Sequence, residues 1–224
     1  MVSSSQEIEF DVNVDIVMCI DATGSMTGAI NMVKDNALNF DRQLKDALKG
    51  KSRVIDRLRI KVITFGDLTF GETQRESPWF DLPQDASAFR DFVESIKVRG
   101  GGGDGTESPL EAIATAMKQD WVKIGSKRRH IILLWTDEGA KMPGVQKVMP
   151  DAPRSLAEFV QQWQDPQMAL MNRSAKRMVL FVPDHPSWEF VDSLENVVRE
   201  TVDVHGGLSD LNMGMVMRYL ADSI

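Results

Sequence analysis

Cysteine is nearly absent from this sequence, and long apolar runs are missing altogether. Cys19 is the single cysteine among 224 residues, which excludes an internal disulfide. Its apolar surroundings predict a buried structural thiol rather than a nucleophile. No apolar stretch approaches the roughly 20 residues needed to span a bilayer, and the opening segment, MVSSSQEIEF, lacks the basic start and apolar core of a secretory signal. We therefore expect a protein of a reducing cytoplasm, and a bacterial one.

Positive charge is also in short supply. The formal net charge is −7, which argues against nucleic acid as the main partner because such binding depends on neutralising phosphates with Lys and Arg. The one basic cluster, Lys127 to Arg129, precedes an apolar segment and is interpreted as the solvated start of a strand. The three histidines are scattered and have no cysteine partners, so we expect no zinc site.

Strand-like and helix-like segments alternate along the chain. Apolar strands are predicted at residues 14–20, 58–65, 130–136 and 177–182, with a short strand near 197–202. Helices are predicted at 26–48, 86–98, from 108 onward, at 155–171 and at 209–221. The turn-rich segment 66–83 is predicted to form an antiparallel edge hairpin, and 138–153 a long surface loop.

This alternation predicts an α/β fold of the Rossmann-like kind. Right-handed crossovers between parallel strands give a mostly parallel central sheet with one antiparallel edge strand and helices on both faces. No internal repeat or linker divides the sequence, so we expect a single domain over residues 1–224. Its core is expected at about 12–222, with 1–11 as an N-terminal extension.

The end of the first predicted strand carries three oxygen-bearing side chains. Asp21 closes the apolar run, and Thr23 and Ser25 follow at two-residue steps, with Gly24 permitting a tight turn. Open α/β sheets bind ligands at the carboxyl ends of their strands. Hard oxygen donors without a basic residue among them suit a divalent cation such as Mg2+ or Mn2+. One alternative is that these side chains simply satisfy the amide groups at the start of the helix.

Two further segments are expected at the same edge of the sheet. Asp137 follows the strand at 130–136 just as Asp21 follows the first. A glycine-rich loop, residues 100–105, contributes Asp104 and leads to Thr106, and its glycines allow the backbone to wrap closely around an ion. Polar groups from three separated segments therefore point to a metal site more strongly than any one of them would.

These residues resemble the von Willebrand factor type A (vWA) domain and its metal-ion-dependent adhesion site, which uses Asp-x-Ser-x-Ser, a loop threonine and a distal aspartate. The run Asp21-Ala-Thr-Gly-Ser25 matches the first element, with threonine in place of the first serine. The run Trp135-Thr-Asp-Glu-Gly139 resembles the Thr-Asp-Gly that ends a strand in the family, so Asp137 is the matching aspartate. The resemblance extends from residue 12 to the last helix.

The middle element departs from the family pattern. The family threonine usually stands directly before a helix, whereas here Asp104, Thr106 and Ser108 compete for that role. Thr106 matches by residue type, and similar proteins with a Gly-Gly-Asp-Gly loop have an acid at the position of Asp104. Ser108 begins a Ser-Pro-Leu-Glu sequence, which is typical of a helix N-cap and capping box. A third carboxylate would tighten cation binding but leave the metal less attractive to a partner.

The resemblance implies a non-enzymatic module for protein–protein interaction. In this family the bound cation takes an Asp or Glu from a partner protein to complete an octahedron, and residues around the rim give specificity; Glu107, Glu138 and Lys141 hold rim positions here. Intracellular prokaryotic relatives often work beside AAA+ ATPases or within bacterial stress and conflict systems, which makes such proteins the expected partners.

An Mg2+-dependent phosphatase of the haloacid-dehalogenase type is the alternative from another class. Those enzymes also place an aspartate after the first strand of a Rossmann-like sheet. They usually need a second acid two residues later to protonate the leaving group. That position is Thr23 in this chain.

Overall fold

The computed structural model describes residues 10–49, 51, 53–100, 103–144, 149–203, 208 and 211–224. For residues 10 and 11 it describes the backbone only. Within these residues a seven-stranded sheet runs in the order β3-β2-β1-β6-β8-β9, and β4 also pairs with β2. The parallel strands are β1 (Phe10–Asp21), β2 (Arg53–Phe65), β6 (Lys127–Trp135), β8 (Lys176–Pro183) and β9 (Val197–Val202). The antiparallel strands are β3 (Arg75–Glu76) and β4 (Phe80–Leu82).

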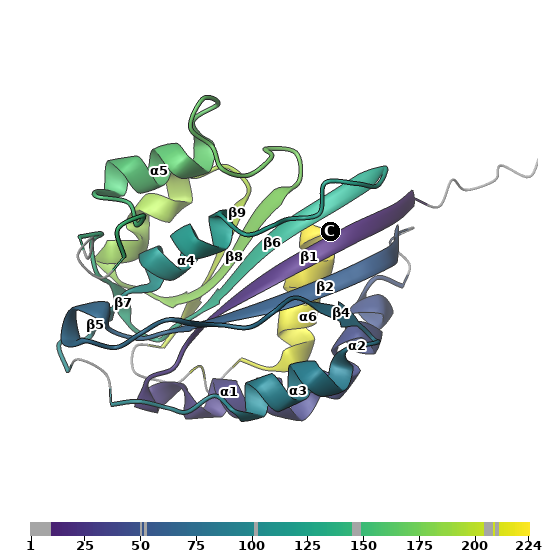
Figure 1. Cartoon of the computed structure of the whole chain (residues 1–224), viewed down its shortest axis with the longest axis horizontal. Coiled ribbons are helices and arrows are strands. Elements are labelled where there is room, and N and C mark those ends of the chain that lie inside the picture. Colours follow the sequence, from purple (N-terminus) through teal and green to yellow (C-terminus); the bar gives the residue numbers. More distant parts are fainter. Residues whose placement is uncertain are drawn as a thin grey trace, which may run out of the picture.

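Helices cover both faces of this sheet (Figure 1). One face carries α1 (Thr27–Asn36), α2 (Phe40–Ala47), α3 (Ala86–Glu94) and α6 (Met213–Ser223). The other face carries α4 (Pro109–Met117), α5 (Leu156–Gln164) and the 3-10 helix Pro186–Ser193. The fold class predicted from the sequence is confirmed.

The central strand β1 shows why the sequence folds this way. Its side chains alternate between the two apolar layers, so that Ile16 and Met18 face α1 and α6 while Val17 and Cys19 face α4. All four are fully buried, and burial of each of the Ile, Met and Val side chains contributes about 1.5–3 kcal/mol of hydrophobic stabilisation. Because β1 and β6 are parallel neighbours, their carboxyl ends reach the same edge of the sheet.

The first long helix differs from its prediction. Residues 26–48 form α1 and α2 separated by a 3-10 turn at Ala37–Asn39, rather than one continuous helix. The Asn36 side-chain amide donates to the Met32 carbonyl oxygen at 2.8 Å, competing with the helical hydrogen-bond ladder. The 3/4 apolar periodicity survives the break, which is why the pattern gave no sign of it.

Other elements also differ from their predictions, in strand pairing or in length. The two short strands of segment 66–83 each pair with β2 and do not form a hairpin with each other. Helix α5 ends at Gln164, before Pro166, and α3 ends at Glu94. Helix α6 begins at Met213, where the Asn212 side chain accepts from Met215 N at 2.9 Å.

Parts of several predicted segments lie outside the described residues: 1–9 of the N-terminal extension, 101–102 of the glycine-rich loop, 145–148 of the long surface loop and 209–210 of the last helix. Among the residues that the structure covers, no helix is long and apolar enough to cross a membrane.

Candidate metal centre

Asp21 ends β1 and is fully buried. Its Oδ1 accepts hydrogen bonds from Thr23 N at 2.9 Å and Thr23 Oγ1 at 2.7 Å, and its Oδ2 accepts from Thr136 Oγ1 at 2.7 Å. Burial raises the pKa of Asp21 to about 6, hydrogen bonds from Thr136 and Thr23 oppose that rise, and the nearby charge of Asp137 adds to it. Hydrogen bonds therefore orient both oxygens of the Asp21 carboxylate, and its ionisation is unfavourable without a nearby positive charge.

Asp137 lies beside Asp21, at the carboxyl end of β6. It is fully buried, and its Oδ1 accepts a hydrogen bond from Ser25 Oγ at 2.9 Å. Ser25 itself is exposed, so this corner opens to solvent. The structure thus brings together Asp21, Thr23, Ser25 and Asp137, as the sequence predicts for the edge where parallel strands end.

The helix-capping alternative holds for Asp21 only in part, because its Oδ1 accepts from Thr23 N just before the helical segment. Thr23 stands before the first turn, the 3-10 helix Gly24–Met26, but makes no side-chain cap. Its hydroxyl donates to Asp21 instead. The hydroxyls of Thr23 and Ser25 therefore donate to the carboxylates of Asp21 and Asp137.

The glycine-rich loop reaches this edge through a two-stranded parallel sheet. Strand β5 (Thr106–Glu107) pairs with β7 (Gly139–Ala140), the short strand that follows Asp137. Gly139 N donates to the Gly105 carbonyl oxygen at 3.2 Å, and Lys141 N donates to the Glu107 carbonyl oxygen at 2.7 Å. The loop is therefore held against the segment after β6.

Asp104 and Thr106 contact each other rather than Asp21. Thr106 Oγ1 donates to Asp104 Oδ1 at 2.9 Å, and Asp104 Oδ2 forms an ion pair with Lys141 Nζ at 3.0 Å. Asp104 is 47% exposed at its side chain, and its pKa is lowered chiefly by the hydrogen bond from Lys141. Neither Asp104 nor Thr106 makes a described contact with Asp21, Thr23, Ser25 or Asp137.

Lys141 holds two loops together at the rim. Its ammonium also forms an ion pair with Asp67, which is fully buried after β2, and donates to Thr69 Oγ1 at 2.8 Å. The same ammonium lies 4.9 Å from the ring centroid of Phe70. This lysine therefore neutralises the charges of Asp67 and Asp104 beside the candidate site.

Ser108 corrects another prediction. It is the residue before α4, but its hydroxyl makes no cap and instead accepts from Leu68 N at 3.1 Å. Its backbone N–H, which a capping box would give to Glu111, donates to the Gly66 carbonyl oxygen at 3.2 Å. Ser108 therefore ties the loop after β2 to the start of α4, since Pro109 already fixes the first helical turn.

Glu107 is the functional candidate that sequence reasoning undervalued, because it placed this residue only on the rim. Glu107 is 4% exposed, and its Oε2 is buried without a hydrogen-bond partner. Burial raises its pKa to about 8, and the charges of Asp21 and Asp67 add to the rise. Alternation along β5, which leaves Thr106 partly exposed and turns Glu107 inward, was the available signal.

Thr136 was read only as the last residue of a strand, yet its hydroxyl orients Asp21. Across the described residues, no three acidic, histidine or cysteine side chains converge closely enough to hold a metal by themselves. The arrangement is instead two buried carboxylates, Asp21 bonded to the hydroxyls of Thr23 and Thr136 and Asp137 to that of Ser25, with the carboxylate of Glu107 nearby.

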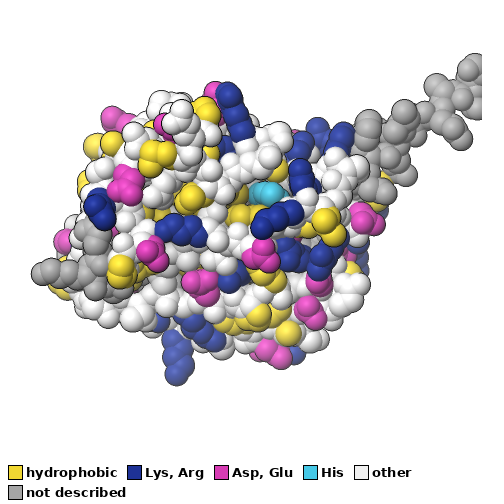
Figure 2. Space-filling model, turned by 45° about the horizontal axis from the view of Figure 1, so that its top comes forward, with side chains coloured by type: hydrophobic (Ala, Val, Ile, Leu, Met, Phe, Trp, Pro, Cys, Tyr) yellow, Lys and Arg dark blue, Asp and Glu magenta, His cyan; other side chains and the backbone are white. Residues whose placement is uncertain are grey.

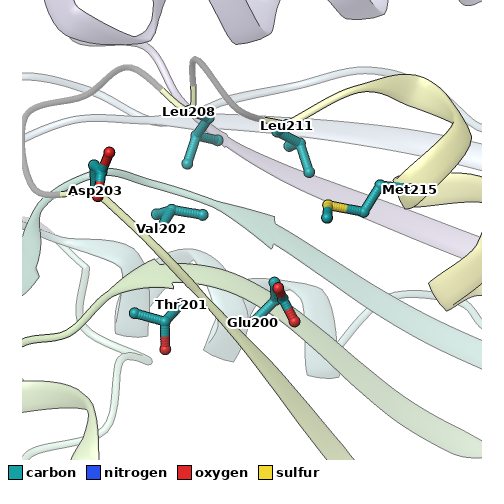
Figure 3. A pocket seen from close by; sticks show the side chains of 7 residues that line it. All are labelled: Glu200, Thr201, Val202, Asp203, Leu208, Leu211 and Met215. Atoms are coloured by element: carbon teal, nitrogen blue, oxygen red, sulfur yellow. The ribbon is translucent and has the colours of Figure 1, made fainter.

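A separate cavity of about 120 Å3 opens between β9 and the start of α6 (Figure 3). It is lined by Glu200, Thr201, Val202, Asp203, Leu208, Leu211 and Met215. None of the candidate metal-site residues lines it.

A sequence model of the von Willebrand factor type A domain matches residues 16–140, more than half of the chain. The matched segment contains Asp21, Thr23, Ser25 and Asp137. The chain belongs to the von Willebrand factor type A domain family. A search of curated proteins finds no match.

Solved structures with the same fold share little sequence with this vWA chain. A von Willebrand factor type A protein from Catenulispora acidiphila has a TM-score of 0.51 at 15% identity and covers 94% of this chain and 42% of its own. The pilus adhesin SpaC from Lactobacillus rhamnosus GG gives 0.53 at 12%, covering 94% and 30%. Proximal thread matrix protein 1 from the mussel byssus gives 0.50 at 13%, covering 95% and 49%. The chain therefore spans less than half the length of each.

Proposed function

We propose that this vWA domain binds Mg2+ or Mn2+ at the carboxyl edge of its sheet and uses the ion to hold an acidic residue of a partner protein. The observation that carries the proposal is the pairing of two fully buried aspartates, Asp21 and Asp137, from neighbouring parallel strands, with Ser25 bridging to one of them. Two buried carboxylates placed close together repel each other, and a divalent cation between them would relieve that repulsion.

The donor set fits a hard dication. Asp21, Asp137 and the hydroxyls of Thr23 and Ser25 are oxygen ligands of the type that Mg2+ prefers. The charge of Glu107 would stand beside the ion, and its orphaned Oε2 would gain a partner in the ion or a water bound to it. Asp104 and Thr106, already engaged with Lys141 and each other, would take part only if the loop rearranged.

Two carboxylates and two hydroxyls leave coordination positions of an octahedral Mg2+ unfilled, and this supports the adhesive role. An Asp or Glu from outside can occupy one of these positions, entering beside the exposed Ser25. Two large apolar side chains, Phe70 and Met142, are 63% and 51% exposed on the neighbouring loops. They offer contact area for the segment that carries the partner's acid.

We propose a non-enzymatic adaptor of a bacterial cytoplasm, acting in a stress or conflict system with an AAA+ ATPase or another component of that system as partner. The resemblance in sequence motivates this setting. Within the site, Thr23 stands where a phosphatase of the alternative class needs an acid, and its hydroxyl is already committed to Asp21.

The test is capture of the partner with immobilised protein in Mg2+, in EDTA and after Mg2+ is restored. The proposal expects a protein that binds in Mg2+, is released by EDTA and returns with Mg2+ or Mn2+. Asp137→Asn should abolish capture, whereas Asp81→Asn, which alters an ion pair with Arg57 on the surface, should not. Capture that is indifferent to both EDTA and Asp137→Asn would overturn the adhesive role.

A further inference from the structure

Basic residues gather at the edge of the sheet opposite the candidate metal centre. The parallel strands β2, β6 and β8 all begin with them: Arg53; Lys127, Arg128 and Arg129; Lys176 and Arg177. Figure 2 shows Lys and Arg side chains concentrated at the end of the molecule where these strands start. The cluster at 127–129 is therefore part of a larger basic edge, and not merely the solvated start of one strand.

Two of these arginines are neighbours on one face. Arg177 pairs in register with Ile131, and Arg129 lies two residues before Ile131 on the same face of β6. Ile131 packs in the apolar layer that α6 covers, so Arg129 and Arg177 lie beyond that layer, at the end of the sheet. Both side chains are half-buried.

These arginines have no counter-ion among the described residues. Arg129 Nη1 donates to the Arg128 carbonyl oxygen at 2.9 Å, and Arg177 Nη1 donates to the Lys176 carbonyl oxygen at 2.6 Å. Arg129 Nε is buried without an acceptor. Burial lowers the pKa of both guanidinium groups; the charges of Arg177 and Arg53 lower the pKa of Arg129 further, and the charge of Arg53 lowers that of Arg177.

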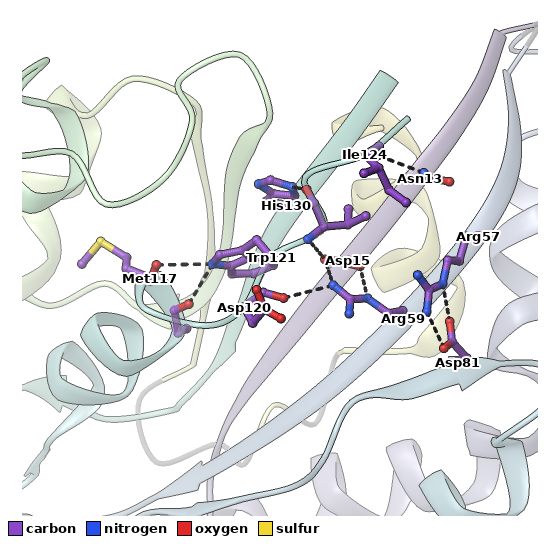
Figure 4. A network of polar contacts seen from close by, with 12 residues as sticks. Asn13, Asp15, Arg57, Arg59, Asp81, Met117, Asp120, Trp121, Ile124 and His130 are labelled. Atoms are coloured by element: carbon purple, nitrogen blue, oxygen red, sulfur yellow. Dashed lines mark hydrogen bonds and ion pairs between the residues drawn. The ribbon is translucent and has the colours of Figure 1, made fainter. Parts of the chain in front are cut away.

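The opposite face of the same edge shows what a satisfied arginine looks like here (Figure 4). Arg59 forms a two-pronged ion pair with buried Asp15, at 2.8 and 2.6 Å, and Arg57 forms one with Asp81, at 2.6 Å for both bonds. Such forked pairs are the strong form of arginine recognition. Arg129 and Arg177 have the donors for this geometry and lack the anion.

Space for a ligand adjoins the pair. A groove of about 380 Å3 runs between β8, β9 and the end of α6. It is lined by Arg177, Met178, Asn196, Val197, Val198, Tyr219, Asp222 and Ser223. Arg177 stands at this groove, so an anionic group bound by the arginines could carry an organic body into it.

We propose that Arg129 and Arg177, with Arg53 at the margin, form a binding site for a phosphate group, either free phosphate or the end of a small organic phosphate. Paired guanidinium forks match the planar and tetrahedral oxyanion geometry that arginine recognises. A phosphate group would accept from the guanidinium nitrogens that face solvent on these half-buried side chains, and would neutralise the repulsion between them. Attraction to the carbonyl end of α6 is the competing role, but the hydrogen bonds of both arginines go to the carbonyl oxygens of Arg128, Ser174 and Lys176, all outside α6.

The test is calorimetric titration of inorganic phosphate and of phenyl phosphate into protein freed of metal on a chelating resin, at constant ionic strength. We expect saturable binding that Arg129→Gln and Arg177→Gln each weaken by about tenfold or more. Tighter binding of phenyl phosphate would identify an organic phosphate seated in the groove, and equal binding would identify free phosphate.

Matched variants keep the result interpretable. Arg57→Gln removes an arginine from the same edge that already has a carboxylate, and it should leave phosphate binding unchanged. Arg177→Lys keeps the charge without the fork and should still weaken binding. Thermal unfolding without phosphate should show Arg177→Gln at least as stable as the parent, because repulsion is relieved. Binding that does not saturate, or that persists equally in both glutamine variants, would overturn the proposal.

Discussion

Ser25 donates a hydrogen bond to Asp137 at 2.9 Å, although 112 residues separate them in the sequence. The contact joins the loop after β1 to the loop after β6. It forms because β1 and β6 are parallel neighbours, so their carboxyl ends lie at the same edge of the sheet. A chain of similar contacts, through Thr23 and Thr136, fixes both oxygens of Asp21. The candidate site is thus oriented before any ion arrives.

Thr136→Val should weaken metal binding while leaving the fold intact. The hydroxyl of Thr136 orients Asp21 Oδ2 from a fully buried position, and loss of such supporting hydrogen bonds typically lowers metal affinity by about tenfold or more. Calorimetric titration with Mn2+ measures the change. Thr106→Val, which removes a hydroxyl bonded to Asp104, is the matched control. A larger loss in Thr106→Val than in Thr136→Val would instead identify Thr106 as the loop ligand.

The metal-free protein should lose stability as the pH rises. The unfolded chain ionises Glu107 near pH 4.5, whereas the folded protein keeps the proton until about pH 8. Between these values the folded state binds more protons, so the free energy of unfolding falls with rising pH. Urea unfolding across this range should show the decline, and Glu107→Gln should make it shallower, leaving the part that the raised pKa values of Asp21 and Glu111 contribute. An unchanged slope in Glu107→Gln would show that another group is responsible.

Lys141→Met should destabilise the rim. It leaves the fully buried Asp67 without its ion pair and releases Asp104. Stranding a buried charge in this way costs about 3 kcal/mol of unfolding free energy. Chemical denaturation measures the loss, and adding Asp67→Asn should restore part of it. Lys49→Met, which breaks an exposed pair with Asp46, should have little effect, and an equal loss there would contradict this account of Lys141.

Asp15→Asn should separate stability from metal binding. Asp15 is 1% exposed, pairs with Arg59 and accepts from Val122 N at 2.7 Å, all at the edge opposite the candidate site. Loss of the buried charge should lower the free energy of unfolding by about 3 kcal/mol without changing Mn2+ affinity in the folded protein. A parallel loss of affinity would mean that the two edges of the sheet are coupled.

The layout of the sheet and the meeting of Asp21 with Asp137 could be predicted from the sequence for a simple reason. Apolar runs identified the buried strands, and the geometry of parallel sheets then placed the residues that end them. Only the identity of neighbouring strands was needed, and not the position of any side chain.

The rest depends on contacts that no local pattern encodes. Glu107 turns inward because β5 pairs with β7, two strands of two residues each. Asp104 turns toward Lys141 because Asp67, after a different strand, draws the same ammonium. The break after Asn36 coincides with one side-chain hydrogen bond, from Asn36 to the Met32 carbonyl oxygen. Each of these outcomes is a choice between partners of similar chemistry, decided by positions that only the folded chain defines.

Calorimetric titration of Mn2+ into the parent protein and Asp21→Asn, with Asp81→Asn as a folded control, tests the central claim most directly. The account predicts one saturable site in the parent and in Asp81→Asn. It predicts that the site is lost in Asp21→Asn, while circular dichroism shows the fold retained. Equal Mn2+ affinity in parent and Asp21→Asn would contradict it.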